Sequence, residues 1–169
     1  ASHPAHSTHG NSSPKMWHGK RRKKMPDYSV KKIIDMEKKY IFELPMKVRD
    51  YEVDSEGIVN NAVYLHYLEH TRHEFCEFAG TSFRSMHERG IDPVLSKVEI
   101  EYKTPLGLGE KFTSCLNLSR EGARFIFLQD IYNSSGKLVV KAKVSCVSTV
   151  NGRLTRGDEI AEAFAKYLP

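Results

Sequence analysis

The sequence of 169 residues lacks several features that define large protein classes. No segment approaches the roughly 18 uninterrupted apolar residues of a membrane-spanning helix, and the N-terminal part has no apolar signal region, so we expect neither a membrane span nor a secretory signal. Only three cysteines occur, and no C-x-x-C pair is among them. Cys76, Cys115 and Cys146 lie in apolar-periodic segments, which argues against a disulfide framework or a zinc ribbon. We therefore expect buried thiols in a reducing compartment, the cytoplasm.

Acidic residues are absent from the first 26 positions, so the positive net charge of the chain comes from its N-terminal part. The whole sequence carries +5, but the first 39 residues hold 10 Lys and Arg against 3 Asp and Glu, whereas the other 130 hold 16 against 18. We expect residues 1–39 to be a disordered basic tail, because they have little apolar surface to bury. A nuclear or nucleic-acid signal, an organellar transit peptide, and sequence added upstream of a native start at Met25 or Met36 all fit this composition.

Residues 40–169 show the periods of a single α+β domain. Apolar side chains alternate from Phe42 to Val48, which predicts a half-buried strand, and Pro45 favours an edge position. From about 60 to 79, apolar residues recur on one helix face, which predicts a helix about 30 Å long that ends at Gly80. Alternating runs predict four further strands, at 96–102, 110–118, 124–132 and 137–150, and a short helix at 158–167.

The resulting order, β-α-β-β-β-β-α, predicts one antiparallel sheet covered by a single long helix. One helix covers only part of a sheet face, so much apolar surface would remain in contact with water. We therefore expect a homodimer or a homotetramer.

The segment from Val48 to Tyr64, V-R-D-Y-E-V-D-S-E-G-I-V-N-N-A-V-Y, carries the residues best suited to chemistry. It places four acids, Asp54 among them, on the loop that leads into the long helix near Asn60. The N-terminus of a helix presents free N–H groups that can polarise a carbonyl oxygen, and a nearby acid can act as nucleophile or general base. This arrangement suits acyl transfer. Asn60 or Asn61 is equally a good helix cap, and acids in a first turn also match the helix dipole.

The pattern D-x-x-G-I-V at Asp54, followed by Asn-Asn, a tyrosine and Tyr67-Leu68-Glu69 along the helix, resembles the hotdog-fold acyl thioesterases of the 4-hydroxybenzoyl-CoA thioesterase-like group. The resemblance covers residues 40–167. It implies a hotdog fold, with an antiparallel sheet wrapped around one long central helix. It also implies hydrolysis of an acyl-CoA or acyl-acyl carrier protein (acyl-ACP) thioester in fatty acid metabolism, without a metal or an organic cofactor, at sites between the subunits of a dimer or tetramer.

The resemblance also assigns roles to individual residues. Asp54 matches the catalytic Asp of the family, and the backbone N–H of Asn61, with that of Asn60, matches the position that polarises the carbonyl. Glu69 is a second candidate on the helix, although a pair with Arg72 or His73 explains it equally well. Gly57 and Tyr64 are substrate-binding candidates beside this motif. Independently of the resemblance, coenzyme A carries phosphates, so the cations of the late strands, Arg120, Arg124, Lys141 and Lys143, are substrate-binding candidates, although a solvated strand face explains them as well.

One departure from the related two-domain plant thioesterases bears on the mechanism. Glu56 and Ile58 stand where those enzymes have Asn and His, which favours a mechanism that depends on Asp54 without a histidine. A dehydratase or hydratase would need a His on this loop, and none is present. A regulator that binds acyl-CoA without turning it over is the other alternative, although a nucleic-acid partner is not expected because the tail shows no helix-turn-helix pattern.

Three histidines on one face of the long helix, His66, His70 and His73, raise the possibility of a metal site. No H-E-x-x-H motif accompanies them, and a solvated helix face explains the same residues. We therefore expect no metal.

Overall fold

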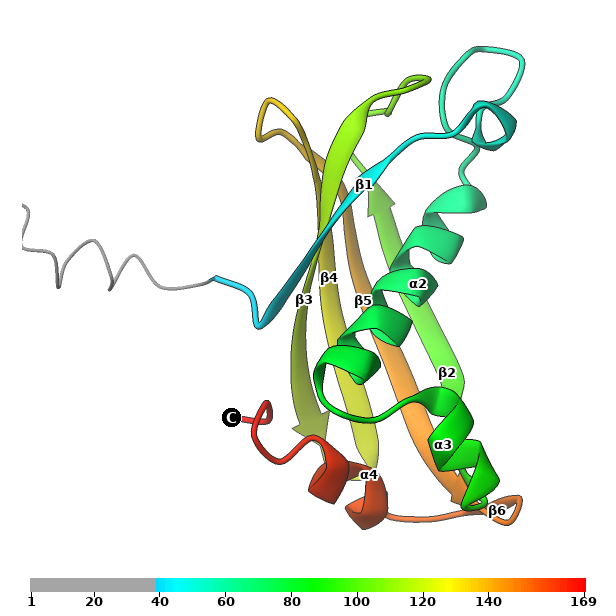
Figure 1. The fold of residues 1–169 in the computed structure, drawn as a ribbon, viewed down its shortest axis with the longest axis vertical. Coiled ribbons are helices and arrows are strands. Elements are labelled where there is room, and N and C mark those ends of the chain that lie inside the picture. The colour runs from blue at the N-terminus through cyan, green and yellow to red at the C-terminus, as the bar shows by residue number, and fades with distance from the viewer. Residues whose placement is uncertain (1–38) are drawn as a thin grey trace, which may run out of the picture. The chain divides into compact units, whose positions relative to one another are not determined.

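The computed structural model describes residues 39–169, so the predicted basic tail, apart from Lys39, lies outside the described residues. The strands form one antiparallel sheet in the order β1-β3-β4-β5-β2, with β6 paired to β5 (Figure 1). The predicted α+β class is therefore confirmed. The elements are β1 (Phe42–Lys47), η1 (Asp50–Glu52), α2 (Val63–Phe78), α3 (Phe83–Glu88), β2 (Ile91–Tyr102), β3 (Lys111–Glu121), β4 (Arg124–Asn133), β5 (Leu138–Val150), β6 (Arg153–Leu154) and α4 (Asp158–Ala163).

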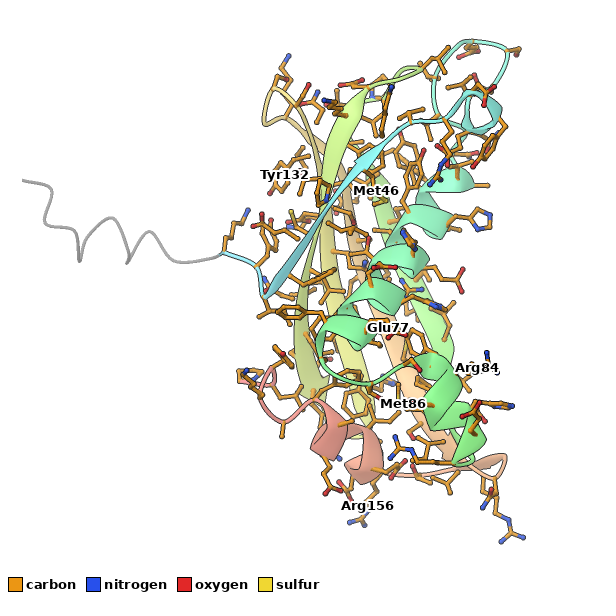
Figure 2. The ribbon with its side chains drawn as sticks, viewed as in Figure 1. Met46, Glu77, Arg84, Met86, Tyr132 and Arg156 are labelled. Atoms are coloured by element: carbon orange, nitrogen blue, oxygen red, sulfur yellow. The ribbon has the colours of Figure 1, made fainter. Side chains whose placement is uncertain are left out.

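Helix α2 lies across one face of the sheet, and its buried side chains recur at helical spacing. Leu68 and Phe75, one on each half of the helix, are fully buried. Burying a side chain of this size contributes about 1.5–3 kcal/mol. One apolar cluster surrounds Leu68 and Phe112, and a second surrounds Phe75 and Phe125. Met46 of β1, labelled in Figure 2, packs against the first cluster.

The start and end of α2 follow from local chemistry. The helix begins at Val63, three residues later than predicted, because Asn60 forms a turn in which its carbonyl accepts the N–H of Val63 at 2.9 Å. It ends before Gly80, which has a φ of +83°, a left-handed value that other residues rarely adopt. The N-terminus of α2 therefore lies directly after the loop that carries Asp54.

Three short elements were not anticipated from the sequence. Helix α3 begins at Phe83 and is capped by Ser82, whose side chain accepts the N–H of Ser85 at 3.0 Å; the helix is too short for a recognisable apolar period. Strand β2 begins at Ile91, five residues before the predicted strand, and a bulge between Leu95 and Lys97 interrupts its alternation. The other two short elements are the single turn η1 and the two-residue strand β6.

Among residues 39–169, no helix is both long enough and apolar enough to cross a membrane.

Candidate active site

The loop before α2 is a tight turn that holds the carboxyl group of Asp54 in a fixed position. The N–H of Asp54 donates to the carbonyl of Ile58 at 2.9 Å, and the N–H of Gly57 donates to the carbonyl of Asp54 at 3.0 Å. One carboxylate oxygen of Asp54 accepts the N–H of Glu56 at 2.9 Å. Gly57 has a φ of +76°, which the turn requires and which glycine adopts without strain. The other carboxylate oxygen of Asp54 has no hydrogen-bond partner among residues 39–169.

Asp54, Asn61 and Tyr64 line one surface pocket of about 510 Å³. Asp54 is half-buried there, whereas Asn61 is exposed at the rim. The predicted acid and the predicted carbonyl-polarising position thus face the same pocket. The remaining lining residues are Ile58, Val59, Tyr102, Lys103, Thr104 and Pro105.

Backbone N–H groups near the start of α2 differ in what they contact. The N–H of Asn60 donates to the carbonyl of Glu52 at 3.0 Å, and the side chain of Asn60 accepts the N–H of Ala62 at 2.9 Å. The N–H of Asn61 has no acceptor among residues 39–169. A free N–H at the beginning of a helix can donate to a carbonyl oxygen that gains negative charge. Both the N–H and the side chain of Asn60 are engaged in the turn before α2, so Asn61 is the available donor.

Two tyrosines form the wall of the pocket. The hydroxyl of Tyr64 accepts the N–H of Leu106 at 3.1 Å, and burial raises the pKa of Tyr64. The hydroxyl of Tyr102 donates to the carbonyl of Asn61 at 3.0 Å, which ties the end of β2 to the start of α2. The two rings meet edge to face, with centroids 5.6 Å apart. Tyr102 therefore holds in place Asn61, the residue with the free N–H.

The sequence profile of the thioesterase-like superfamily matches residues 48–168. The chain belongs to the thioesterase-like superfamily. The match begins at Val48, directly after β1, and includes every residue that lines the pocket.

Individual relatives agree with this membership. A chloroplastic acyl-acyl carrier protein thioesterase of Arabidopsis thaliana is 39% identical over 85 residues, which are 50% of this chain and 45% of that protein. The chain thus spans less than half the length of this relative. The acyl-CoA thioester hydrolase YbgC of Escherichia coli is 26% identical over 108 residues, covering 63% of this chain and 81% of that protein. A crystal structure of a protein from Aquifex aeolicus superposes with a TM-score of 0.68 at 30% identity, covering 72% of this chain and 98% of that one. The predicted hotdog fold is confirmed.

In this thioesterase-like chain, Glu69 does not face the pocket of Asp54. It lines a separate cavity of about 390 Å³ between α2, α3 and β2, together with Arg72 and His73. Arg72 donates to the side chain of Gln129 at 2.9 Å, and His73 stacks edge to face on Phe83. The predicted pairing of Glu69 with either neighbour is therefore not formed.

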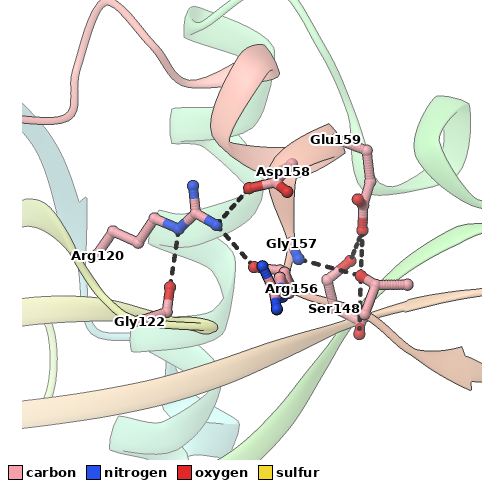
Figure 3. Close-up of polar contacts among 8 residues, drawn as sticks. Arg120, Gly122, Ser148, Arg156, Gly157, Asp158 and Glu159 are labelled. Carbon is pink, nitrogen blue, oxygen red and sulfur yellow. Dashed lines mark hydrogen bonds and ion pairs between the residues drawn. The ribbon is translucent and has the colours of Figure 1, made fainter.

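Arg120 and Arg124 lie at the opposite end of the sheet from Asp54. Lys47, where β1 leaves toward Asp54, pairs with Lys111 at the start of β3, so the end of β3 is remote from the pocket. Arg120 donates there to Asp158 at 2.6 Å and to the carbonyls of neighbouring loops (Figure 3). These contacts anchor the C-terminal segment. Arg124 is exposed at the start of β4, Lys141 is exposed on β5, and Lys143 pairs with Glu121 at 3.2 Å.

Other candidate chemistries have no assembled site in the described residues. His66, His70 and His73 are exposed, and within residues 39–169 no three His, Cys, Asp or Glu side chains gather as metal ligands. Cys76 is fully buried, and burial raises its pKa to about 12, so its thiol is neutral and a poor nucleophile at neutral pH.

Three residues that shape the site could not be identified from the sequence. Tyr102 and Lys103 reach the pocket from the end of β2, about 40 positions after Asn61 along the chain. Lys103 is the only lysine or arginine that lines this pocket, and it also contacts Glu101 at 2.5 Å. Glu52 is one of the four acids of the segment before α2, and its side chain is buried. The alternation of apolar residues over 96–102 predicts the strand, but no feature of the nearby sequence indicates that the end of this strand contacts the start of α2.

Proposed function

We propose that this protein hydrolyses acyl thioesters, with Asp54 as the essential acid and the N–H of Asn61 as the donor to the carbonyl oxygen. The observation that carries the proposal is the shared pocket, which is lined both by Asp54, whose carboxylate a turn holds, and by Asn61, whose N–H near the start of α2 is free. Membership of the thioesterase-like superfamily supports the choice of a thioester as the substrate.

The geometry fits two versions of the reaction. As a general base, Asp54 takes a proton from water, and the water oxygen attacks the thioester carbonyl while the N–H of Asn61 holds the developing oxyanion. The tetrahedral intermediate then collapses, the C–S bond breaks, and the thiolate takes up the proton. As a nucleophile, Asp54 attacks the carbonyl itself and displaces the thiolate, and water hydrolyses the resulting anhydride. The products are the same acid and thiol in both versions.

The thiol carrier is either coenzyme A or acyl carrier protein, because relatives of both kinds occur: the Arabidopsis thioesterase acts on acyl-acyl carrier protein and YbgC on acyl-CoA. Lys103 at the pocket is a cation suited to the phosphate that both carriers hold. We place the reaction in fatty acid metabolism. The compartment also stays a prediction: buried thiols favour the cytoplasm, whereas the Arabidopsis relative is chloroplastic and residues 1–26 are acid-free.

We further propose that the active form is a homodimer or homotetramer. Leu65 of α2 and Val94 and Leu95 of β2 are apolar and between 42% and 51% exposed. Strand β2 is the last strand of the sheet path, so one of its edges is unpaired within residues 39–169. Light scattering coupled to size exclusion should give at least twice the monomer mass, and Leu95→Glu should reduce it. A native chain that runs as a monomer at micromolar concentration contradicts this proposal.

The deciding experiment compares Asp54→Asn with Glu56→Gln on acyl-CoA and acyl-ACP substrates. Loss of a general base or nucleophile should lower kcat by about 10²–10⁴-fold in Asp54→Asn. Glu56 lies on the same loop, but its side chain is exposed and does not line the pocket. Glu56→Gln is therefore the matched control and should keep native turnover. Full activity of Asp54→Asn refutes the mechanism, and binding of acyl-CoA without any turnover favours the regulator instead.

A further inference from the structure

Glu52 is the only buried acidic residue among residues 39–169, and it lies two positions before Asp54. Its side chain is 7% exposed. One carboxylate oxygen accepts the hydroxyl of Tyr67 at 2.6 Å and the backbone N–H of Arg49 at 2.7 Å. The other accepts the guanidinium of Arg49 at 3.0 Å. The carboxylate is therefore held by three donors from two different segments.

These donors explain how a carboxylate can be buried at this place. Burial alone would raise the pKa of Glu52, but the hydrogen bonds from Tyr67 and Arg49 outweigh it and lower the pKa. The group is thus ionised at neutral pH. A buried charge without such partners would be costly, so these contacts bind the segments firmly to one another.

Glu52 joins the loop of Asp54 to helix α2 through two contacts, one of its backbone and one of its side chain. The backbone carbonyl of Glu52 accepts the N–H of Asn60, next to the free N–H of Asn61, at 3.0 Å. Its side chain reaches Tyr67, one turn into the helix, and the ring of Tyr67 packs on Phe112 with centroids 4.7 Å apart. The distance between Asp54 and the N–H of Asn61 therefore depends on Glu52. Neither Glu52 nor Tyr67 lines the pocket.

We propose that Glu52 and Tyr67 form a positioning pair, which holds the Asp54 loop against the first turn of α2 so that the carboxylate and the N–H of Asn61 face one substrate carbonyl. This inference rests on the proposed function and extends it to residues that do not touch the substrate. Displacing a reacting group by about 1 Å can cost a factor of about 10² in rate.

The test removes only the hydroxyl that connects the pair. Tyr67→Phe keeps the ring on Phe112 and should lower kcat by about 10- to 100-fold, with KM changed far less. Thr71→Val is the matched control: it removes another buried hydroxyl of α2, one turn further from the pocket, which lies 2.7 Å from Ser114 Oγ and 2.7 Å from the backbone carbonyl of Tyr67, and it leaves the hydroxyl of Tyr67 on Glu52. This variant should lower the melting temperature to a similar degree and keep the native kcat. Circular dichroism well below the melting temperature verifies that both variants are folded.

A double-mutant cycle separates positioning from general loosening. If Tyr67 acts through Asp54, then Asp54→Asn should cost much less in the Tyr67→Phe background than in the native chain. Losses that multiply independently, or a kcat of Tyr67→Phe equal to that of Thr71→Val, overturn the inference while the thioesterase function stands. A native chain without any thioester turnover overturns the proposed function and this inference with it.

Discussion

Gly157, at the start of α4, is the position where the structure predicts a large effect from one added methyl group. It has a φ of +77°, and a Cβ there would lie 2.6 Å from Cε2 of Phe125. Phe125 is only 1% exposed and packs within the second apolar cluster, so moving its ring would disturb that packing. The left-handed backbone costs an alanine about 1–2 kcal/mol. Overpacking against a buried ring adds about 1–3 kcal/mol.

Gly157→Ala should therefore lower the free energy of unfolding by about 2–5 kcal/mol. Gly136→Ala is the matched control, because Gly136 has a φ of +75° and its Cβ would meet nothing within 4 Å. It should lose only the backbone part, about 1–2 kcal/mol. Urea denaturation of both variants gives the difference between them, which isolates the clash with Phe125. Equal losses in the two variants refute the steric reasoning. Gly157 lies at the opposite end of the sheet from Asp54, and neither glycine lines the pocket of Asp54, so the kcat of the folded protein should stay native.

Two further predictions concern the site. Asn61→Pro should lower kcat by about 10²–10³-fold more than Asn61→Ala, because only proline removes the backbone N–H; steady-state kinetics that give equal values for both variants exclude this N–H as the donor. The lowered pKa of Glu52 means that its ionised form stabilises the fold above its ordinary value of 4.5, and that this contribution disappears as the pH falls through the folded-state pKa. Urea denaturation of the native chain and of Glu52→Gln should therefore differ at pH 7 and converge in acid, and a difference that does not depend on pH contradicts this reasoning.

Much of the fold could be predicted from local sequence alone. Alternation from Phe42 to Val48 and the helical spacing of Leu68 and Phe75 arise because each side chain faces either core or solvent, and that choice repeats with the period of the element. The motif at Asp54, and a helix that begins within a few residues of it, could likewise be predicted, because turn residues act on their immediate neighbours. These features gave the α+β class and the acid of the candidate site.

The partners of these residues were decided only by the tertiary structure. Tyr102 reaches the N-terminus of α2 because β2 pairs with β5 in one particular register. Arg120 lies at the far end of the sheet because β3 likewise pairs with β1 in one particular register. Glu52 and Asp54 are two acids of one loop, yet one is buried against Tyr67 and the other faces the pocket. Composition and period cannot separate them, because burial depends on which distant segments close over each side chain. The sequence by itself determined the main elements and the candidate acid Asp54, whereas the packing of those elements determined which groups surround it.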